Sequence, residues 1–163
     1  MRIAGTVQDS IVDGPGFRFT VFTQGCSHHC PGCHNPQTHD PSGGTEHTVE
    51  ELLERMRSNP LTDGLTLSGG EPFEQPEDCL LLAQGAHESG LNVWSYTGYL
   101  VEFLCDQGTE AQKALLREVD VLVDGPFLLD QRTLSLPWRG SRNQRVIDVP
   151  KSLENGDVVL FQL

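Results

Sequence analysis

Apolar and polar positions along this chain switch several times between the period of a strand and the period of a helix. Residues 17–23 (FRFTVFT) alternate and are rich in β-branched and aromatic side chains, which predicts a strand. Three later apolar runs also predict strands: 64–68, 91–99 and 120–126. Helical apolar spacing predicts three helices: 48–59, 76–90 and 111–119. Thr48, with Glu51 three positions later, has the pattern of a capping box that opens the first helix.

The order of these elements, strand and helix in turn, predicts a parallel sheet with right-handed crossovers. The chain has 163 residues, fewer than the roughly 250 of a complete (β/α) barrel. We therefore expect the α/β class: a reduced, open partial (β/α) barrel with a curved, mostly parallel sheet, forming a single domain over residues 1–163. Beyond Pro137 the pattern weakens, and residues 144–149 and 157–163 are expected to add one or two edge strands.

Chemically distinctive residues follow each of the four predicted strands. In parallel sheets, binding sites gather at the carboxyl ends of the strands. The residues at these ends are Cys26 to Cys33 after the first strand, Gly69, Gly70 and Glu71 after the second, Thr97 and Gly98 at the third, and Asp124 at the fourth. The agreement between topology and chemistry predicts one functional site at this edge of the sheet.

Charge and composition exclude some classes of function. The formal net charge of −12 argues against nonspecific binding to nucleic acid, which needs cations to neutralise phosphates. No apolar run approaches the roughly 20 residues that span a bilayer, and the first ten residues lack a signal-peptide core. We therefore expect a cytoplasmic protein with no membrane contact.

Three cysteines, Cys26, Cys30 and Cys33, have the spacing C-x3-C-x2-C in a loop rich in glycine and proline. Thiolates suit zinc or iron–sulfur clusters. A closed zinc site needs a fourth ligand, for which the neighbouring histidines His28, His29 and His34 are candidates. Three thiolates on a [4Fe–4S] cluster would instead leave one iron open. The three cysteines alone do not separate these two possibilities. Cys79 falls on the predicted helix 76–90, and Cys105 is expected on a further helix before 111–119; we expect both to be small buried side chains.

The cysteine spacing, together with the Gly-Gly-Glu turn after the second strand, resembles the radical S-adenosylmethionine (SAM) superfamily. The resemblance implies a [4Fe–4S] cluster on Cys26, Cys30 and Cys33, with SAM on the fourth iron and no catalytic residue beyond these two cofactors. It also implies that the turn of Gly69, Gly70 and Glu71 binds the methionyl amino group, although Glu71 can instead hold the turn.

Further SAM contacts are expected from residues near this turn and the cysteines. The position before the third cysteine is often aromatic in the superfamily, and here it is Gly32. The backbone of Gly32, Cys33 and His34 is therefore expected to approach the adenine. Thr97 and Asp124 are candidates for hydrogen bonds to the ribose or amino group of SAM. The alternative for Asp124 is a turn-capping role beside Gly125.

Four other segments, VDGPGFRFTVFTQGC, YTGY, LVDGPF and WRGSRNQ, together with CPGCHNP, resemble the anaerobic ribonucleotide reductase activating enzymes. This family implies that the chain makes a glycyl radical on the large subunit of anaerobic ribonucleoside-triphosphate reductase. It also implies an electron donor of the reduced flavodoxin, ferredoxin or thiol type. Arg139 and Arg142 are candidates for docking the partner or binding the SAM carboxylate; the alternative is a solvated loop that pairs with nearby carboxylates.

Three alternatives to this function remain at the level of sequence. The chain can activate a different glycyl radical enzyme, or act on a small molecule as deazaguanine-forming radical SAM enzymes do. It can also be a zinc-binding module without enzymatic activity. Iron and sulfide content separates the last alternative from the others.

Overall fold

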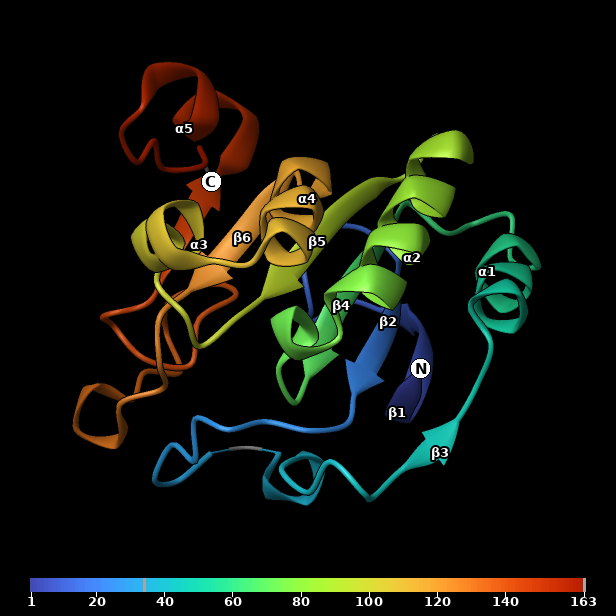
Figure 1. Cartoon of the computed structure of the whole chain (residues 1–163), viewed down its shortest axis with the longest axis horizontal. Coiled ribbons are helices and arrows are strands. Elements are labelled where there is room, and N and C mark those ends of the chain that lie inside the picture. Colours follow the sequence, from blue (N-terminus) through green and yellow to red (C-terminus); the bar gives the residue numbers. More distant parts are fainter. Residues whose placement is uncertain (34, 163) are drawn as a thin grey trace.

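The computed structural model describes residues 1–33 and 35–162. In this part of the chain one seven-stranded sheet has the order β3-β1-β2-β4-β5-β6-β7 (Figure 1). The strands are β1 (Arg2–Ser10), β2 (Arg18–Thr23), β3 (Thr45–Glu46), β4 (Gly64–Gly69), β5 (Asn92–Tyr96), β6 (Val121–Asp124) and β7 (Arg145–Asp148). The α-helices are α1 (Val49–Arg57), α2 (Pro76–Glu88), α3 (Val101–Gln107), α4 (Glu110–Glu118) and α5 (Val149–Asn155). Short 3-10 helices are η1 (Pro36–Thr38), η2 (Pro72–Glu74) and η3 (Leu129–Gln131).

The four strands predicted from the sequence form the parallel centre of this sheet. β2 pairs with β4, β4 with β5 and β5 with β6, all in parallel. Helices α1, α2 and the pair α3–α4 connect them in turn. The expected fold class, an open partial barrel with a mostly parallel sheet, is therefore confirmed. The antiparallel pairs lie toward the edges, where β1 joins β2, β3 joins β1 and β7 joins β6.

The edges of the sheet differ from the sequence prediction. β1 was not predicted, because only its two ends, Ile3 at the start and Ser10 at the finish, bury side chains, and its pairing with β2 is irregular at two places. At the other edge, β7 confirms the strand expected within 144–149. The segment 157–163 contributes only a bridge between Ile147 and Leu160, and Leu163 lies outside the described residues.

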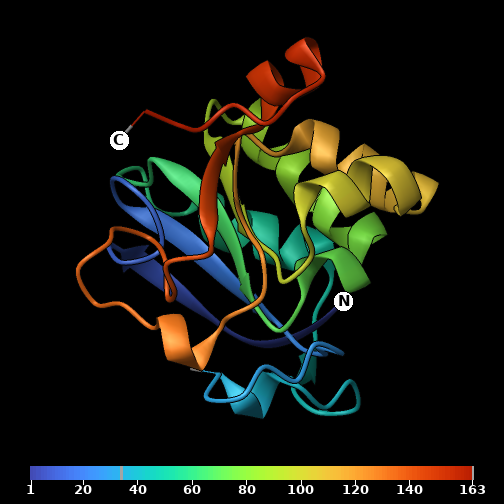
Figure 2. The same ribbon diagram turned by 90° about the vertical axis from the view of Figure 1, so that its left-hand side faces the viewer.

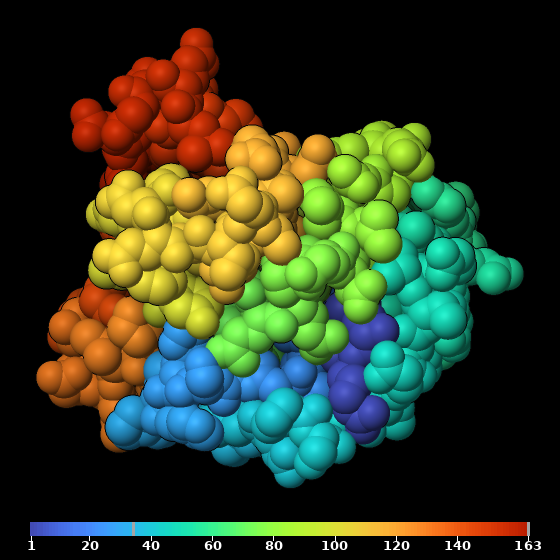
Figure 3. Space-filling model, viewed as in Figure 1, coloured from blue at the N-terminus to red at the C-terminus, as the bar shows by residue number. Residues whose placement is uncertain are grey.

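Alternation along the central strands sends side chains to two different environments. Phe19, Val21, Leu65 and Leu67 are fully buried under the helices, which cover one face of the sheet (Figures 2 and 3). Each such side chain stabilises the fold by about 2 kcal/mol through burial. The opposite face carries a smaller apolar cluster around Trp94 and otherwise polar side chains. Because helices cover only one face, the other is available for a binding site.

Side-chain caps open helices α1 and α4, and the cap of α1 is the one that the sequence predicts. The side chain of Thr48 accepts a hydrogen bond from Glu51 N (3.1 Å), but the Glu51 carboxylate pairs with His47 and Arg55. The complete reciprocal capping box is at α4, between Thr109 and Gln112. Among the described residues, no helix is both long and apolar enough to span a bilayer.

The two cysteines outside the cluster motif have different environments. Cys79 on α2 is fully buried, and desolvation raises the pKa of its thiol. Cys105 on α3 is exposed, so its predicted burial is wrong. The helix around Cys105 turns Val101 and Leu104 to the core, which leaves Cys105 on the solvent side.

Candidate active site

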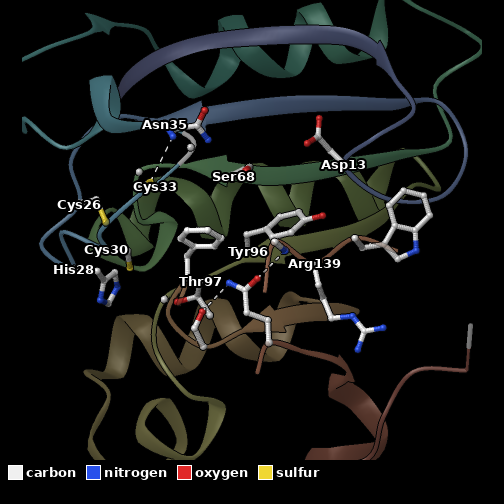
Figure 4. A pocket seen from close by; sticks show the side chains of 18 of the residues that line it. Asp13, Cys26, His28, Cys30, Cys33, Asn35, Ser68, Tyr96, Thr97 and Arg139 are labelled. Atoms are coloured by element: carbon white, nitrogen blue, oxygen red, sulfur yellow. Dashed lines mark hydrogen bonds between the residues drawn. The ribbon is translucent and has the colours of Figure 1, made fainter. Parts of the chain in front are cut away.

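A cavity of about 640 Å³ opens at the carboxyl ends of the parallel strands. Its walls are the cysteine loop after β2, the ends of β4 and β5, and the segment between β6 and β7 (Figure 4). The predicted site residues that line it are Cys26, Cys30, Cys33, Gly69, Gly70, Thr97 and Arg139. The tertiary structure thus gathers residues that are more than a hundred positions apart in the sequence.

Backbone hydrogen bonds hold the cysteine loop against the following segment. Gly25 N donates to Thr38 O (2.6 Å) and Cys26 N donates to His39 O (3.1 Å). A tight turn closes with the bond from Cys33 N to Cys30 O (3.1 Å), and Gly32 takes a positive φ of 73° within it. This turn needs glycine and brings Cys30 and Cys33 to the same end of the cavity. Desolvation raises the pKa of Cys26 to about 11.

Three thiols on one loop are a donor set that fits a [4Fe–4S] cluster. Among the described residues, which leave out His34, no group of three His, Cys, Asp or Glu side chains is placed to hold one metal ion. One zinc ion needs its thiolates on a common centre, each about 2.3 Å from the metal. A [4Fe–4S] cluster binds each thiolate through a different iron, so the sulfur atoms stand farther apart. The spread of Cys26, Cys30 and Cys33 around one cavity end is compatible with that donor set.

The turn of Gly69 and Gly70 lies against the start of the cysteine loop. Gly70 N donates to Thr23 O and Glu71 N donates to Gly25 O, both at 2.8 Å. A Cβ on Gly70 would lie 2.4 Å from Gly25 O. The close approach that requires glycine at position 70 is therefore between two backbone segments of the protein.

Glu71 is buried behind the turn rather than exposed in the cavity. Its side chain is 0% exposed and accepts hydrogen bonds from Phe73 N (3.1 Å), Gly98 N (2.7 Å) and the Thr97 hydroxyl (2.9 Å). His28 Nε2 lies 2.6 Å from its Oε1. That bond raises the pKa of His28, although burial opposes the shift. In this geometry Glu71 holds the turn, the alternative that the sequence left open.

Thr97 and Asp124 end neighbouring strands but face different surroundings. Thr97 lines the cavity. Asp124 is fully buried and does not line it; its carboxylate accepts hydrogen bonds from Val101 N (2.9 Å) and from Arg145 (2.6 and 3.0 Å). The carboxylate thus ties α3 and β7 to the end of β6. Its contacts support a structural role in place of the predicted SAM contact.

Asp124→Asn tests this assignment. The substitution removes the charge opposite Arg145, and we expect it to lower the free energy of unfolding by about 2 kcal/mol. Thermal unfolding of the purified protein measures the loss, and exposed Asp130→Asn is the matched control. SAM affinity of the folded variant should stay at the wild-type value. Weaker SAM binding without a loss of stability would instead make Asp124 a ligand.

The remaining predicted SAM contacts are only partly placed at the cavity. Cys33 lines it, whereas Gly32 is exposed on the outer turn next to Leu129. His34 lies outside the described residues. The next residue along the chain, Asn35, lines the cavity and donates its N–H to Cys33 Sγ (3.4 Å).

Sequence reasoning missed three cavity residues at the end away from the cysteines. Asp13 and Tyr96 lie there (Figure 4), and Trp138, the neighbour of Arg139 in the sequence, also lines the cavity. Asp13 Oδ2 accepts hydrogen bonds from the hydroxyls of Ser10 and Thr20, and burial raises the pKa of Tyr96. All three residues stand in segments that carried the family resemblance, namely VDGPG, YTGY and WRGSRNQ, but the sequence alone gave their side chains no role.

The two docking candidates differ in position. Arg139 lines the cavity, whereas Arg142 is exposed and does not. Within residues 1–33 and 35–162, neither forms an ion pair, whereas the nearby Arg145 pairs with Asp124 and Glu102. Both guanidinium groups are available to an external partner.

Comparison with known proteins gives a consistent set of relatives. Residues 12–147 match the family model described as a 4Fe-4S single cluster domain. An anaerobic ribonucleoside-triphosphate reductase-activating protein from Escherichia coli K12 is 40% identical over 146 residues, covering 83% of this chain and 91% of the relative. The protein of that name from Salmonella typhi is 38% identical over 144 residues, with the same coverage. The one from Enterobacteria phage T4 is 37% identical over 142 residues, covering 83% of this chain and 86% of the relative.

Proposed function

This chain belongs to the anaerobic ribonucleoside-triphosphate reductase-activating proteins, and we propose that it makes a glycyl radical on that reductase by reductive cleavage of SAM. The observation that carries the proposal is the shared cavity. Three cysteines, the Gly69–Gly70 turn and Thr97 line it together, although they follow three different strands. We further propose that residues 1–163 act as one radical SAM domain, because a single sheet supplies all these walls.

Each part of the cavity has a distinct task in this proposal. The thiolates of Cys26, Cys30 and Cys33 hold three irons of the cluster, and the backbone of Gly69 and Gly70 positions the amino group of SAM. The bound cluster and SAM supply an electron and the 5′-deoxyadenosyl radical that removes a hydrogen atom from the target glycine. Helices behind the sheet and the buried Glu71 network keep the strand ends rigid, which preserves the alignment of the bound groups.

The segment between β6 and β7 forms the far wall of the cavity. Leu134 of this segment and Val12, which also lines the cavity, are 87% and 73% exposed, which is unusual for large apolar side chains that line a cavity. We propose that the glycine loop of the reductase covers these side chains and excludes water from the site. The electron donor is proposed to be a reduced flavodoxin, ferredoxin or thiol protein, each of which can be supplied separately in an assay.

Anaerobic reconstitution tests the proposal. The protein should take up iron and sulfide in the ratio of a [4Fe–4S] cluster and cleave SAM when reduced. With the reductase present, electron paramagnetic resonance (EPR) should detect a glycyl radical on that partner. Zinc uptake without sulfide would favour the zinc-binding module, and SAM cleavage without a radical on the reductase would point to a different substrate.

Arg139→Ala tests the docking part of the proposal. Removal of a cavity-lining guanidinium should lower the radical yield about ten-fold at limiting reductase, because interface arginines often contribute strongly to binding. Arg142→Ala should have a smaller effect, since Arg142 lies outside the cavity wall. Exposed Arg117→Ala on α4 is the control.

Iron content and SAM affinity are measured on the same samples. If both fall together with the radical yield in Arg139→Ala, Arg139 belongs to the cofactor site rather than to the docking surface. If the yield stays at the wild-type level, the arginine is only a solvated charge.

A further inference from the structure

The carboxylate of Glu71 joins three separate segments of the cavity wall. Phe73 N donates to it from the turn after β4, and Thr97 and Gly98 donate from the end of β5. The third segment is the cysteine loop, which contributes His28 through its Nε2, 2.6 Å from Glu71 Oε1. Because the Glu71 side chain is 0% exposed, water does not compete for these bonds. The His28 bond is therefore a direct link between the cysteine loop and the strand ends.

The imidazole of His28 occupies a slot formed by the YTGY segment. A Cβ on Gly98 would lie 2.6 Å from the ring of His28, so the ring fits only beside a glycine. The ring of Tyr99 closes the slot from another side, with its centroid 4.6 Å away at an interplanar angle of 75°. His28 itself is only 17% exposed and also lines the cavity. This combination of a shape-matched slot and a buried acceptor distinguishes His28 from an ordinary loop residue.

The neighbouring His29 has none of these contacts. It is exposed, and within residues 1–33 and 35–162 its ring contacts only that of His39, with centroids 5.5 Å apart. Other bonds hold the beginning of the cysteine loop, where Cys26 N donates to His39 O and Ser27 N donates to Glu74. Between Cys26 and Cys30, the Ser27 hydroxyl bonds Glu74 of η2, and His28 is the residue whose side chain bonds the Glu71 carboxylate.

We infer that His28 is a positioning residue, which uses the Glu71 carboxylate and the Gly98 slot to hold the cysteine loop in register with the strand ends that bind SAM. The inference rests on the proposed function. As a consequence, the cluster iron without a cysteine ligand would stay in a fixed position relative to the SAM site. Without His28, Glu71 still holds the turn and the end of β5, but the cysteine loop loses the bond that joins it to the Glu71 carboxylate and, through it, to the end of β5. It keeps the bonds of its first residues, Gly25 and Ser27, to the segment after β4.

His28→Ala, compared with His29→Ala, tests the inference. In the reconstituted protein His28→Ala should keep its iron but bind SAM about ten-fold more weakly, the effect of losing one charge-assisted hydrogen bond. The change that SAM causes in the EPR spectrum of the reduced cluster should also be altered. His28→Gln, whose amide can donate to Glu71, should recover part of both properties. His29→Ala should match the wild type.

Gly98→Ala provides a second variant that moves the ring without removing it. Its Cβ should displace His28 and weaken SAM binding in the wild-type background, but it should have little further effect in His28→Ala. Independent, additive losses in this double-mutant cycle would overturn the inference. So would wild-type SAM affinity and EPR response in His28→Ala.

Measurements on cluster-free protein separate failure of this inference from failure of the proposed function. Alkylation of Cys26 and Cys30, followed by mass spectrometry, should be faster in His28→Ala than in His29→Ala, because the loop is no longer tied down. Equal rates would overturn the positioning role even if the protein binds a cluster. Faster alkylation in a protein that takes up no iron would support the link but refute the proposed function.

Discussion

Alanine at Cys26, Cys30 or Cys33 is expected to reduce iron and sulfide uptake to background and to abolish SAM cleavage. Each thiolate binds a different iron in the proposed cluster, so the two cysteines that remain in each variant cannot replace the missing ligand. The three side chains line one end of the same cavity, which is the reason to expect equal losses from the three variants. Iron and sulfide assays after anaerobic reconstitution, with the absorbance of the cluster, measure the result.

The two remaining cysteines are the controls for this prediction. Cys105→Ala changes an exposed position and should alter stability by less than about 0.5 kcal/mol. Cys79→Ala leaves a small cavity in the core and should cost about 1 kcal/mol while the iron content is kept. Loss of the cluster absorbance in either control would show that the set of ligands is wrong.

Gly70→Val should have the second large effect, because Gly70 packs against the backbone of the cysteine loop. The added side chain would begin 2.4 Å from Gly25 O, at the start of the cysteine loop. Relief of this overlap must separate the turn from the loop, which breaks the bonds from Gly70 N to Thr23 O and from Glu71 N to Gly25 O. We expect a loss of about 3 kcal/mol in stability, with lower iron content as well as weaker SAM binding.

Gly5→Ala is a matched control, since a Cβ there meets nothing within 4 Å. Thermal unfolding, iron content and SAM affinity are compared across the two variants. If the turn served only to bind SAM, the cluster would form normally in Gly70→Val and only SAM binding would fall. If that pattern is observed, the turn moves independently of the cysteine loop and the backbone explanation is incorrect.

Local patterns were sufficient for the centre of the fold. Apolar alternation in β2 and the short apolar runs of β4, β5 and β6 identified the parallel strands, because their side chains are buried on a helix-covered face. β1 has no such signal, since most of its residues are exposed or half-buried and its stability comes from pairing with β2. The exposure of Cys105 was also missed, because a helical pattern does not fix which face meets the core when the helix is only seven residues long.

By itself the sequence determined the order of the four parallel strands along the chain, the three clustered cysteines and the turn that follows the next strand. Those features depend on residue type, spacing and chain direction, which are local properties. Only the tertiary structure decided how the polar groups at the strand ends are used. Glu71 and Asp124 look alike in sequence, because each is a carboxylate at the end of a parallel strand. In the structure, each accepts hydrogen bonds from donors in distant segments of the chain. A buried carboxylate binds whichever donors the fold places around it, and for these two the donors belong to the protein itself.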